Sequence, residues 1–184
     1  AQSSFKYDLV ITLNTPDLES LGEIFENNTD LFYRLPIINI DHNSGNEHYG
    51  AVNLVEVTKI TASEIVYSLF KEIDNSLIDE EMATAFLTGI ISKTRSFKTN
   101  NITPMTLNIS SELMSRGGDR EKIIRHLFYN RSISSLKIWG QALSHLQHDP
   151  QKGLIWTAIS RDELTRSQAG PSDLDDLIDE LILN

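Results

Sequence analysis

The order of apolar and polar positions along the chain predicts three short buried strands followed by a series of helices. Tyr7–Leu13 and Ile37–Ile40 are continuous apolar runs rich in β-branched residues, and Val52–Val55 is a shorter run expected at a sheet edge. A turn at 14–17 and a short helix at 18–25 separate the first two strands. Continuous apolar strands are typical of parallel sheets that helices cover on both faces. The pattern therefore predicts an α/β fold with a parallel sheet flanked by helices.

Helical spacing dominates after the third strand. Thr61 followed by Glu64 is a capping-box pattern, which opens a helix that buries apolar residues at positions 65, 66, 69, 70 and 73. The next helix is expected to start near Asp79 and to run into Ser92–Phe97. Further helices are expected at 106–115, 120–129 and 133–147. The residues expected to form the core between sheet and helices are Val10, Ile11, Ile38, Ile40, Phe86 and Ile90.

The composition changes at His148–Gly153, which is typical of a turn or linker. Leu154–Ile159 is a predicted strand, Ser160 begins another capping box, and Ser172 is expected to cap a final amphipathic helix. We therefore predict one domain over residues 1–147, and a linker with the beginning of a second region over 148–184.

Composition and charge limit the kinds of ligand. The formal net charge is −10, which argues against a long non-specific nucleic-acid track but leaves room for a small nucleotide or a short oligonucleotide in a local pocket. No apolar run reaches about 18 residues, so no membrane span is predicted. No secretory signal is visible, and the absence of cysteine fits a cytoplasmic location.

Several segments carry a resemblance to a known family. Ile38–Asn43 is a short apolar strand ending in Asp-His-Asn, Leu87–Phe97 reads Leu-Thr-Gly-Ile-Ile-Ser-Lys-Thr-Arg-Ser-Phe, and Tyr7–Gly22 precedes both. In order and spacing they resemble the third, fourth and second motifs of the DHH phosphoesterases. Two further segments, Asn101–Thr106 and Arg131–Lys137, resemble the nanoRNase and pAp-phosphatase branch, which is RecJ-like. Trp156–Ile159 resembles the first strand of the associated DHHA1 domain.

The resemblance implies a DHH-type domain over 1–147 and the start of a DHHA1-like lobe over 148–184. Enzymes of this family hydrolyse phosphodiesters or 3′-phosphates in short oligonucleotides or small nucleotides, using two manganese ions that activate a water molecule. By that resemblance Asp41 and His42 are the remaining catalytic candidates, with His42 at the position of a metal ligand. The candidates for contacting the substrate are Asn43, Thr94, Ser96 and Arg131.

Three departures from the family pattern fall on functional positions. Asn14 and Lys93 stand where the second and fourth motifs have a metal-binding Asp, and Asn43 stands where a histidine contacts phosphate. The first motif would precede Tyr7, and the Gly-Gly-Gly-His motif would follow residue 184. The degenerate metal positions are then Asn14, Asp41, His42 and Lys93. We expect no metal there, and we expect the ammonium of Lys93 to pair with Asp41 instead.

Each candidate also has a purely structural interpretation. Asp41 and His42 can be a strand-end pair, Lys93 can lie in solvent, and Thr94 and Ser96 can shape a turn. Arg131 can serve packing or a salt bridge. Three functions remain open. The chain is a degenerate member that binds a nucleotide or a protein partner, or an active manganese-dependent phosphodiesterase completed by missing segments or by a partner. The third alternative is a protein-interaction scaffold without nucleotide binding, whose partner is another protein or a second copy of the chain.

Overall fold

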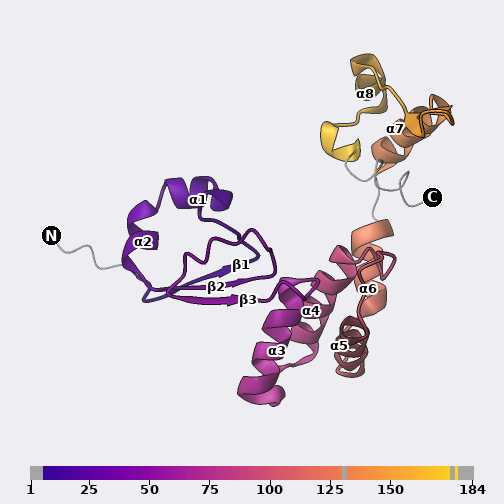
Figure 1. The fold of residues 1–184 in the computed structure, drawn as a ribbon. Helices are drawn as coiled ribbons and strands as arrows, with labels where there is room; N and C mark the ends of the chain where they lie inside the picture. The colour runs from indigo at the N-terminus through magenta and orange to yellow at the C-terminus, as the bar shows by residue number, and fades with distance from the viewer. Residues whose placement is uncertain (1–5, 130–131, 175–176, 178–184) are drawn as a thin grey trace. The chain divides into compact units, whose positions relative to one another are not determined.

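The computed structural model describes residues 6–129, 132–174 and 177 (Figure 1). The chain divides into two compact units, residues 1–127 and 128–184. The domain boundary expected after residue 147 rests on the composition change at 148–153 and on the family resemblance. The division into compact units does not test it, so it stays a prediction.

A three-stranded parallel sheet is the centre of the first unit. Its strands are β1 (Val10–Leu13), β2 (Ile37–Asp41) and β3 (Val52–Val55), in the order β1-β2-β3 (Figure 1). The register places Ile38 opposite both Ile11 and Val52. The predicted α/β fold with a parallel sheet flanked by helices is confirmed, and β3 is an edge strand as expected.

One face of the sheet packs against the short helices that connect the first two strands. These are η1 (Glu19–Leu21), α1 (Glu23–Glu26) and α2 (Thr29–Arg34). Phe25 and Phe32 meet edge to face, with ring centroids 5.5 Å apart, and form a cluster with Ile37 and the partly buried Val10. Edge-to-face aromatic packing adds to the free energy gained by burying these rings.

The other face of β1 differs from the expectation. Ile11 was expected in the core but is 57% exposed, and Leu9 and Leu13 on the same face are 43% and 53% exposed. Side chains alternate along a strand, so Val10 and Thr12 point to the packed face while these three point away from it. The expectation for Ile11 is wrong because no described element covers this face over β1.

The rest of the first unit is helical. Its elements are α3 (Ala62–Asp74), η2 (Asn75–Leu77), α4 (Glu80–Lys93), α5 (Pro104–Ser115) and α6 (Arg120–Ile124). The boundary between the two units falls within η3 (Arg125–Tyr129). The expected cap at Thr61 is confirmed, since its side chain accepts from the backbone N–H of Glu64. The helix expected to start near Asp79 is α4, and the side chain of Asp79 caps it by accepting from the backbone N–H of Met82. The helix core is fully buried at Ile65, Leu87, Ile90, Ile91 and Leu113.

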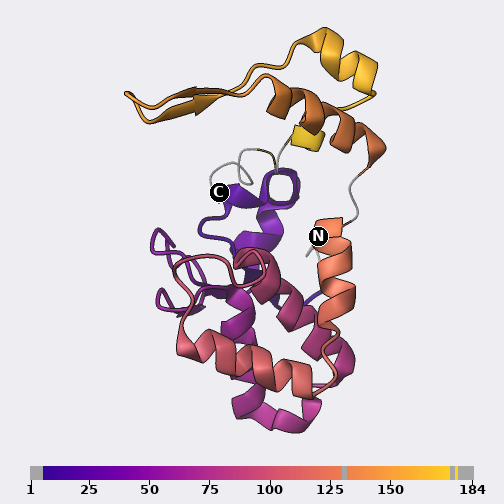
Figure 2. The same ribbon diagram turned by 90° about the vertical axis from the view of Figure 1, so that its right-hand side faces the viewer.

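The second unit is small. It contains α7 (Ile133–Ser144), the antiparallel strands β4 (Gln147–Asp149) and β5 (Leu154–Trp156), α8 (Arg161–Ser167) and η4 (Pro171–Leu174). The segment predicted as a turn or linker at 148–153 contains the end of β4 and the turn of the β4–β5 hairpin, seen in Figure 2 as a narrow ribbon extending from the helices of this unit. The capping box at Ser160 is confirmed. Most of the helix expected after Ser172 lies outside the described residues.

None of the helices in the described ranges combines the length and the apolar character needed to cross a membrane.

Candidate functional site

The candidate positions of the second and third motifs meet at the carboxyl ends of β1 and β2. Asn14 follows β1 directly, and its backbone N–H donates to the carbonyl oxygen of Ile40 at 2.9 Å. Its φ is +56°, in the left-handed region that asparagine tolerates better than most residues, and its side chain is exposed. Asp41 is the last residue of β2. The parallel register thus brings Asn14 and Asp41 to the same edge of the sheet, where ligands bind in many α/β proteins.

The carboxylate of Asp41 is almost completely buried, with 1% exposure. Its Oδ1 accepts from the backbone N–H groups of His42 at 2.7 Å and Asn43 at 3.3 Å. Its Oδ2 accepts from Nδ2 of Asn46 at 2.8 Å. Three donors therefore satisfy the carboxylate within the chain, and it fixes the backbone turn that presents His42 and Asn43.

Asn46 connects this carboxylate to the strands. Besides Asp41, its Nδ2 reaches the carbonyl oxygen of Thr15 at 3.3 Å. Its Oδ1 accepts from Nδ2 of Asn39 at 2.7 Å and from the backbone N–H of His48 at 2.9 Å. Asn39 is fully buried in the middle of β2, and its Nδ2 also donates to Oδ1 of Asn53 at 3.3 Å. All hydrogen-bonding groups of the Asn46 amide are thus used in the buried interior.

Tyr49 completes the network from the side of β1. Its hydroxyl lies 2.8 Å from Oγ1 of Thr12 and 3.0 Å from the carbonyl oxygen of Thr15. Burial raises the pKa of Tyr49; its hydrogen bond with Thr12 opposes that shift, and the charges of Asp41 and Asp17 reinforce it. The edge of the sheet is therefore filled mainly by neutral amides and hydroxyls, with Asp41 as the one carboxylate of this network.

His42 and Asn43 lie at the surface of this buried network. His42 is half-buried, and its ring makes no hydrogen bond to any described residue. The exposed side chain of Asn43 closes a local turn, since its Oδ1 accepts from the backbone N–H of Gly45 at 2.9 Å. His42 is thus the candidate whose polar atoms stay available to a ligand.

The expected ion pair between Lys93 and Asp41 is wrong. Lys93 is the last residue of α4, is exposed, and makes no salt bridge within the described part of the chain. The physical reason is that Asp41 already has three N–H donors, so it needs no cation. A lysine in the last turn of a helix also interacts favourably with the carbonyl groups at that end.

The other candidates for contacting a substrate have different outcomes. Thr94 is fully buried, and its hydroxyl donates to Ile90 at 2.7 Å and accepts from the N–H of Phe97 at 3.1 Å. The hydroxyl of Thr94 therefore helps to end α4, and the substrate role expected for this residue stays a prediction. Ser96 is partly exposed with φ +59°, and its proposed role stays a prediction. Arg131 lies outside the described residues.

These side chains do not fit a dinuclear manganese site. Among the four degenerate positions, the carboxylate of Asp41 already accepts three hydrogen bonds, Asn14 is neutral and Lys93 carries a positive charge. His42 is the one of the four whose ring makes no hydrogen bond to a described residue. Within the described ranges, no three His, Asp or Glu side chains gather so that they could hold a metal ion. No reaction step through a metal is therefore derived for these residues.

The sequence reasoning missed the amide network. The apolar run at Ile37–Ile40 predicts a buried strand, and Asn39 within it is a polar residue that needs a buried partner. The need for a partner indicates that another polar side chain lies close to Asn39. The structure shows that its partners are Asn46, Asn53 and Thr12.

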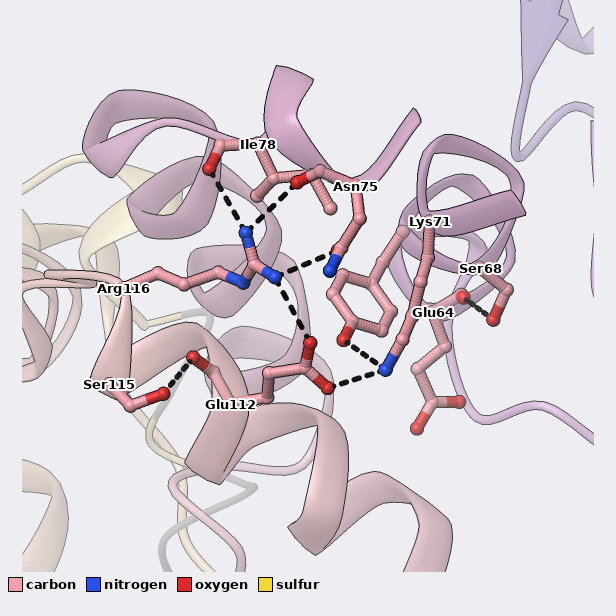
Figure 3. A network of polar contacts seen from close by, with 9 residues as sticks. Glu64, Ser68, Lys71, Asn75, Ile78, Glu112, Ser115 and Arg116 are labelled. Carbon is pink, nitrogen blue, oxygen red and sulfur yellow. Dashed lines mark hydrogen bonds and ion pairs between the residues drawn. The ribbon is translucent and has the colours of Figure 1, made fainter. Parts of the chain in front are cut away.

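A second polar cluster joins α3 to α5 and η2 (Figure 3). Nζ of Lys71 lies 2.7 Å from Oε2 of Glu112 and 3.4 Å from the hydroxyl of Tyr67. Arg116 contacts the other carboxylate oxygen of Glu112 at 3.3 Å and donates to both the carbonyl and the side-chain oxygen of Asn75. Hydrogen bonds from Lys71 and Tyr67, with help from the two positive charges, lower the pKa of Glu112 to about 2. The cluster holds α3, α5 and η2 together, although Nε of Arg116 is buried and has no hydrogen-bond partner among the described residues.

Comparisons with known proteins agree with this architecture. No protein-family model matches the chain. The bifunctional oligoribonuclease and PAP phosphatase NrnA of Thermus thermophilus is 32% identical over 108 residues, which cover 59% of this chain and 33% of the relative. The chain therefore spans about a third of this curated relative.

Two solved structures share the fold. An exopolyphosphatase-related protein from Bacteroides fragilis has a TM-score of 0.87 at 22% identity, covering 95% of this chain and 51% of that chain. A Methanococcus jannaschii protein described as a family II inorganic pyrophosphatase has a TM-score of 0.53 at 16% identity, covering 95% and 59%. The resemblance inferred from the motifs is confirmed: the chain is related to the DHH phosphoesterases.

Proposed function

We propose that this DHH-type chain binds a small nucleotide or a short oligonucleotide and hydrolyses it slowly or not at all. The observation that carries the proposal is the saturated carboxylate of Asp41, held by three N–H donors where the family's motifs converge. Asn14, Asn43 and Lys93 replace groups that the metal mechanism needs. Losses within one cooperating site reduce rates by orders of magnitude.

A nucleotide ligand is supported by the relative, whose name describes an oligoribonuclease and PAP phosphatase. It is also supported by the half-buried, unpaired ring of His42 beside the exposed Asn43, since both can donate to or accept from a phosphate or base. We place the protein in the cytoplasm because it has no cysteine.

Hydrolysis and binding test the proposal together. Purified protein is incubated with adenosine 3′,5′-bisphosphate or an RNA dinucleotide and manganese, and binding of the same compounds is measured by calorimetric titration. We expect saturable binding, with turnover far below the typical enzymatic rate of about 1 per second. His42→Ala should weaken binding, whereas Lys152→Ala, an exposed change in the second unit, should not.

Two outcomes would reject the proposal. Turnover near 1 per second that co-elutes with the protein and disappears in His42→Ala would establish a manganese-dependent phosphodiesterase. Absence of binding to either compound, together with a defined homodimer or protein complex, would favour the scaffold function.

A further inference from the structure

The charges of this acidic chain are unevenly distributed. The chain has 26 Asp and Glu residues, yet none of the thirty positions between Glu81 and Glu112 carries one. The charged residues of that interval are Lys93, Arg95 and Lys98, which fall within six positions. A positive potential is therefore concentrated on the turn that follows α4, in a chain whose net charge is −10.

Two of these cations are not neutralised by the protein. Lys93 and Lys98 are exposed, and neither makes a salt bridge to a described residue. Lys93 has a structural use at the carboxyl end of α4. Lys98 lies beyond the helix, so this use does not account for it. Lysines near one another repel, which is tolerated best where an anion binds between them.

The backbone of the same turn is strained. Arg95, Ser96 and Phe97 have φ values of +48°, +59° and +66°, so three consecutive non-glycine residues are left-handed. Each such residue costs about 1–2 kcal/mol. The conformation is held by Ser96 N–H to Ile91 O at 2.8 Å and Lys98 N–H to Thr94 O at 2.9 Å. Strain of this kind clusters at ligand sites, where it fixes side-chain positions in advance.

An unsatisfied polar atom adjoins the turn. Oγ1 of Thr99 is buried and has no hydrogen-bond partner among the residues that the structure describes. A buried hydroxyl without a partner carries a free-energy cost that an added acceptor removes. The position directly after Lys98 therefore carries a hydroxyl that no described residue pairs, and a small shift of the turn would be needed for it to reach a ligand.

We propose that the turn at 93–98 binds a terminal phosphate group, with the ammonium groups of Lys93 and Lys98 neutralising its charge. The two ammonium groups then provide the attraction for phosphate that metal ions provide in metal-dependent enzymes. The identity of the remainder of the ligand, a nucleotide, rests on the proposed function. The inference that the bound group is a phosphate rests on the turn at 93–98 alone.

The first experiment compares adenosine 3′,5′-bisphosphate with adenosine by calorimetric titration. In the double variant Lys93→Gln, Lys98→Gln, we expect affinity for the bisphosphate to fall at least about tenfold, because two charge-assisted contacts are lost. Adenosine should bind the variant as it binds the wild type. The matched control is Arg120→Gln, Lys122→Gln, which also removes two positive charges but at exposed positions that alternate with Asp119 and Glu121. The control should stay within about twofold of the wild type.

The second experiment uses inorganic phosphate, so it does not depend on a nucleotide. At equal ionic strength, phosphate should raise the melting temperature of the wild type above its value in chloride more than it does for the double variant. Each single variant should show a partial loss. Circular dichroism checks that the variants are folded.

The outcomes separate the two proposals. If the bisphosphate does not bind but phosphate stabilises the protein through Lys93 and Lys98, the nucleotide function fails and the phosphate turn stands. If the bisphosphate binds the double variant as tightly as the wild type, or the control loses as much, the phosphate turn is rejected while nucleotide binding stands. A wild type that responds to neither probe rejects both.

Discussion

The carboxylate of Asp41 is buried but needs no cation, because three N–H groups surround it. A buried charge is tolerable only when it is paired or fully hydrogen-bonded. Here the amide of Asn46 and two backbone N–H groups supply the bonds. The carboxylate of Asp41 thus orients the turn that carries His42 and Asn43.

Asn46→Ala should be far more destabilising than a change at the neighbouring surface. The variant leaves Oδ2 of Asp41 and Nδ2 of Asn39 without their shared partner, both in the interior. We expect the free energy of unfolding to fall by about 2–3 kcal/mol, measured by urea denaturation. Asn43→Ala is the matched control, because it removes one exposed hydrogen bond and should cost less than about 1 kcal/mol. Equal costs for the two variants would mean that the buried network contributes little.

At the scale of elements, the helices are joined by charges as well as by apolar packing. Glu112 on α5 pairs with Lys71 on α3 and with Arg116, the residue that follows α5, while Arg116 also donates to the carbonyl oxygen of Asn75 in η2. These contacts bridge segments about forty positions apart in sequence. The cluster therefore restrains how α5 lies against α3 and η2.

This cluster should make stability depend on pH. The pKa of Glu112 is lowered from 4.5 to about 2, so its contribution is present above pH 4.5 and is lost as the pH falls toward 2. The side chain is 32% exposed, so solvent screening limits the contribution to about 1 kcal/mol or less. The difference in urea midpoint between wild type and Glu112→Gln should be largest at pH 7 and should shrink by pH 3. Glu72→Gln, an exposed change on α3, should show no such trend. A difference that grows on acidification would contradict this assignment.

For the molecule as a whole, the sequence predicted the parts that local patterns determine. Continuous apolar runs predicted β1, β2 and β3, the capping-box pattern predicted the cap at Thr61, and helical spacing predicted the start of α4 near Asp79. Contacts between distant segments were not predicted. The run at Tyr7–Leu13 cannot show which face of β1 is covered, and Ile11 is exposed.

The candidate site was predicted less completely than the fold, for the same physical reason. The motif spacing placed Asn14 and Asp41 at one edge of the sheet. The motif spacing did not predict that Asn46, five positions after Asp41, would donate a hydrogen bond to the carboxylate. It also did not predict that Lys93 would be exposed. Side-chain partners depend on how a loop folds back, and no periodic pattern encodes that.

The final prediction concerns the response of the whole molecule to metal. A ligand that binds only the folded state raises the free energy of unfolding by RT ln(1 + [L]/Kd). A ligand concentration about 100 times Kd therefore adds roughly 2.7 kcal/mol. Because Asp41 is saturated and Asn14 and Lys93 are poor ligands, 1 mM manganese should leave the melting temperature unchanged, as should a chelator. Calorimetric scans of protein prepared with manganese and with chelator measure this. The matched control is Asn14→Asp with Lys93→Asp, which restores carboxylates at two degenerate positions. A rise in melting temperature with manganese in the wild type itself would show that a metal site survives in this chain.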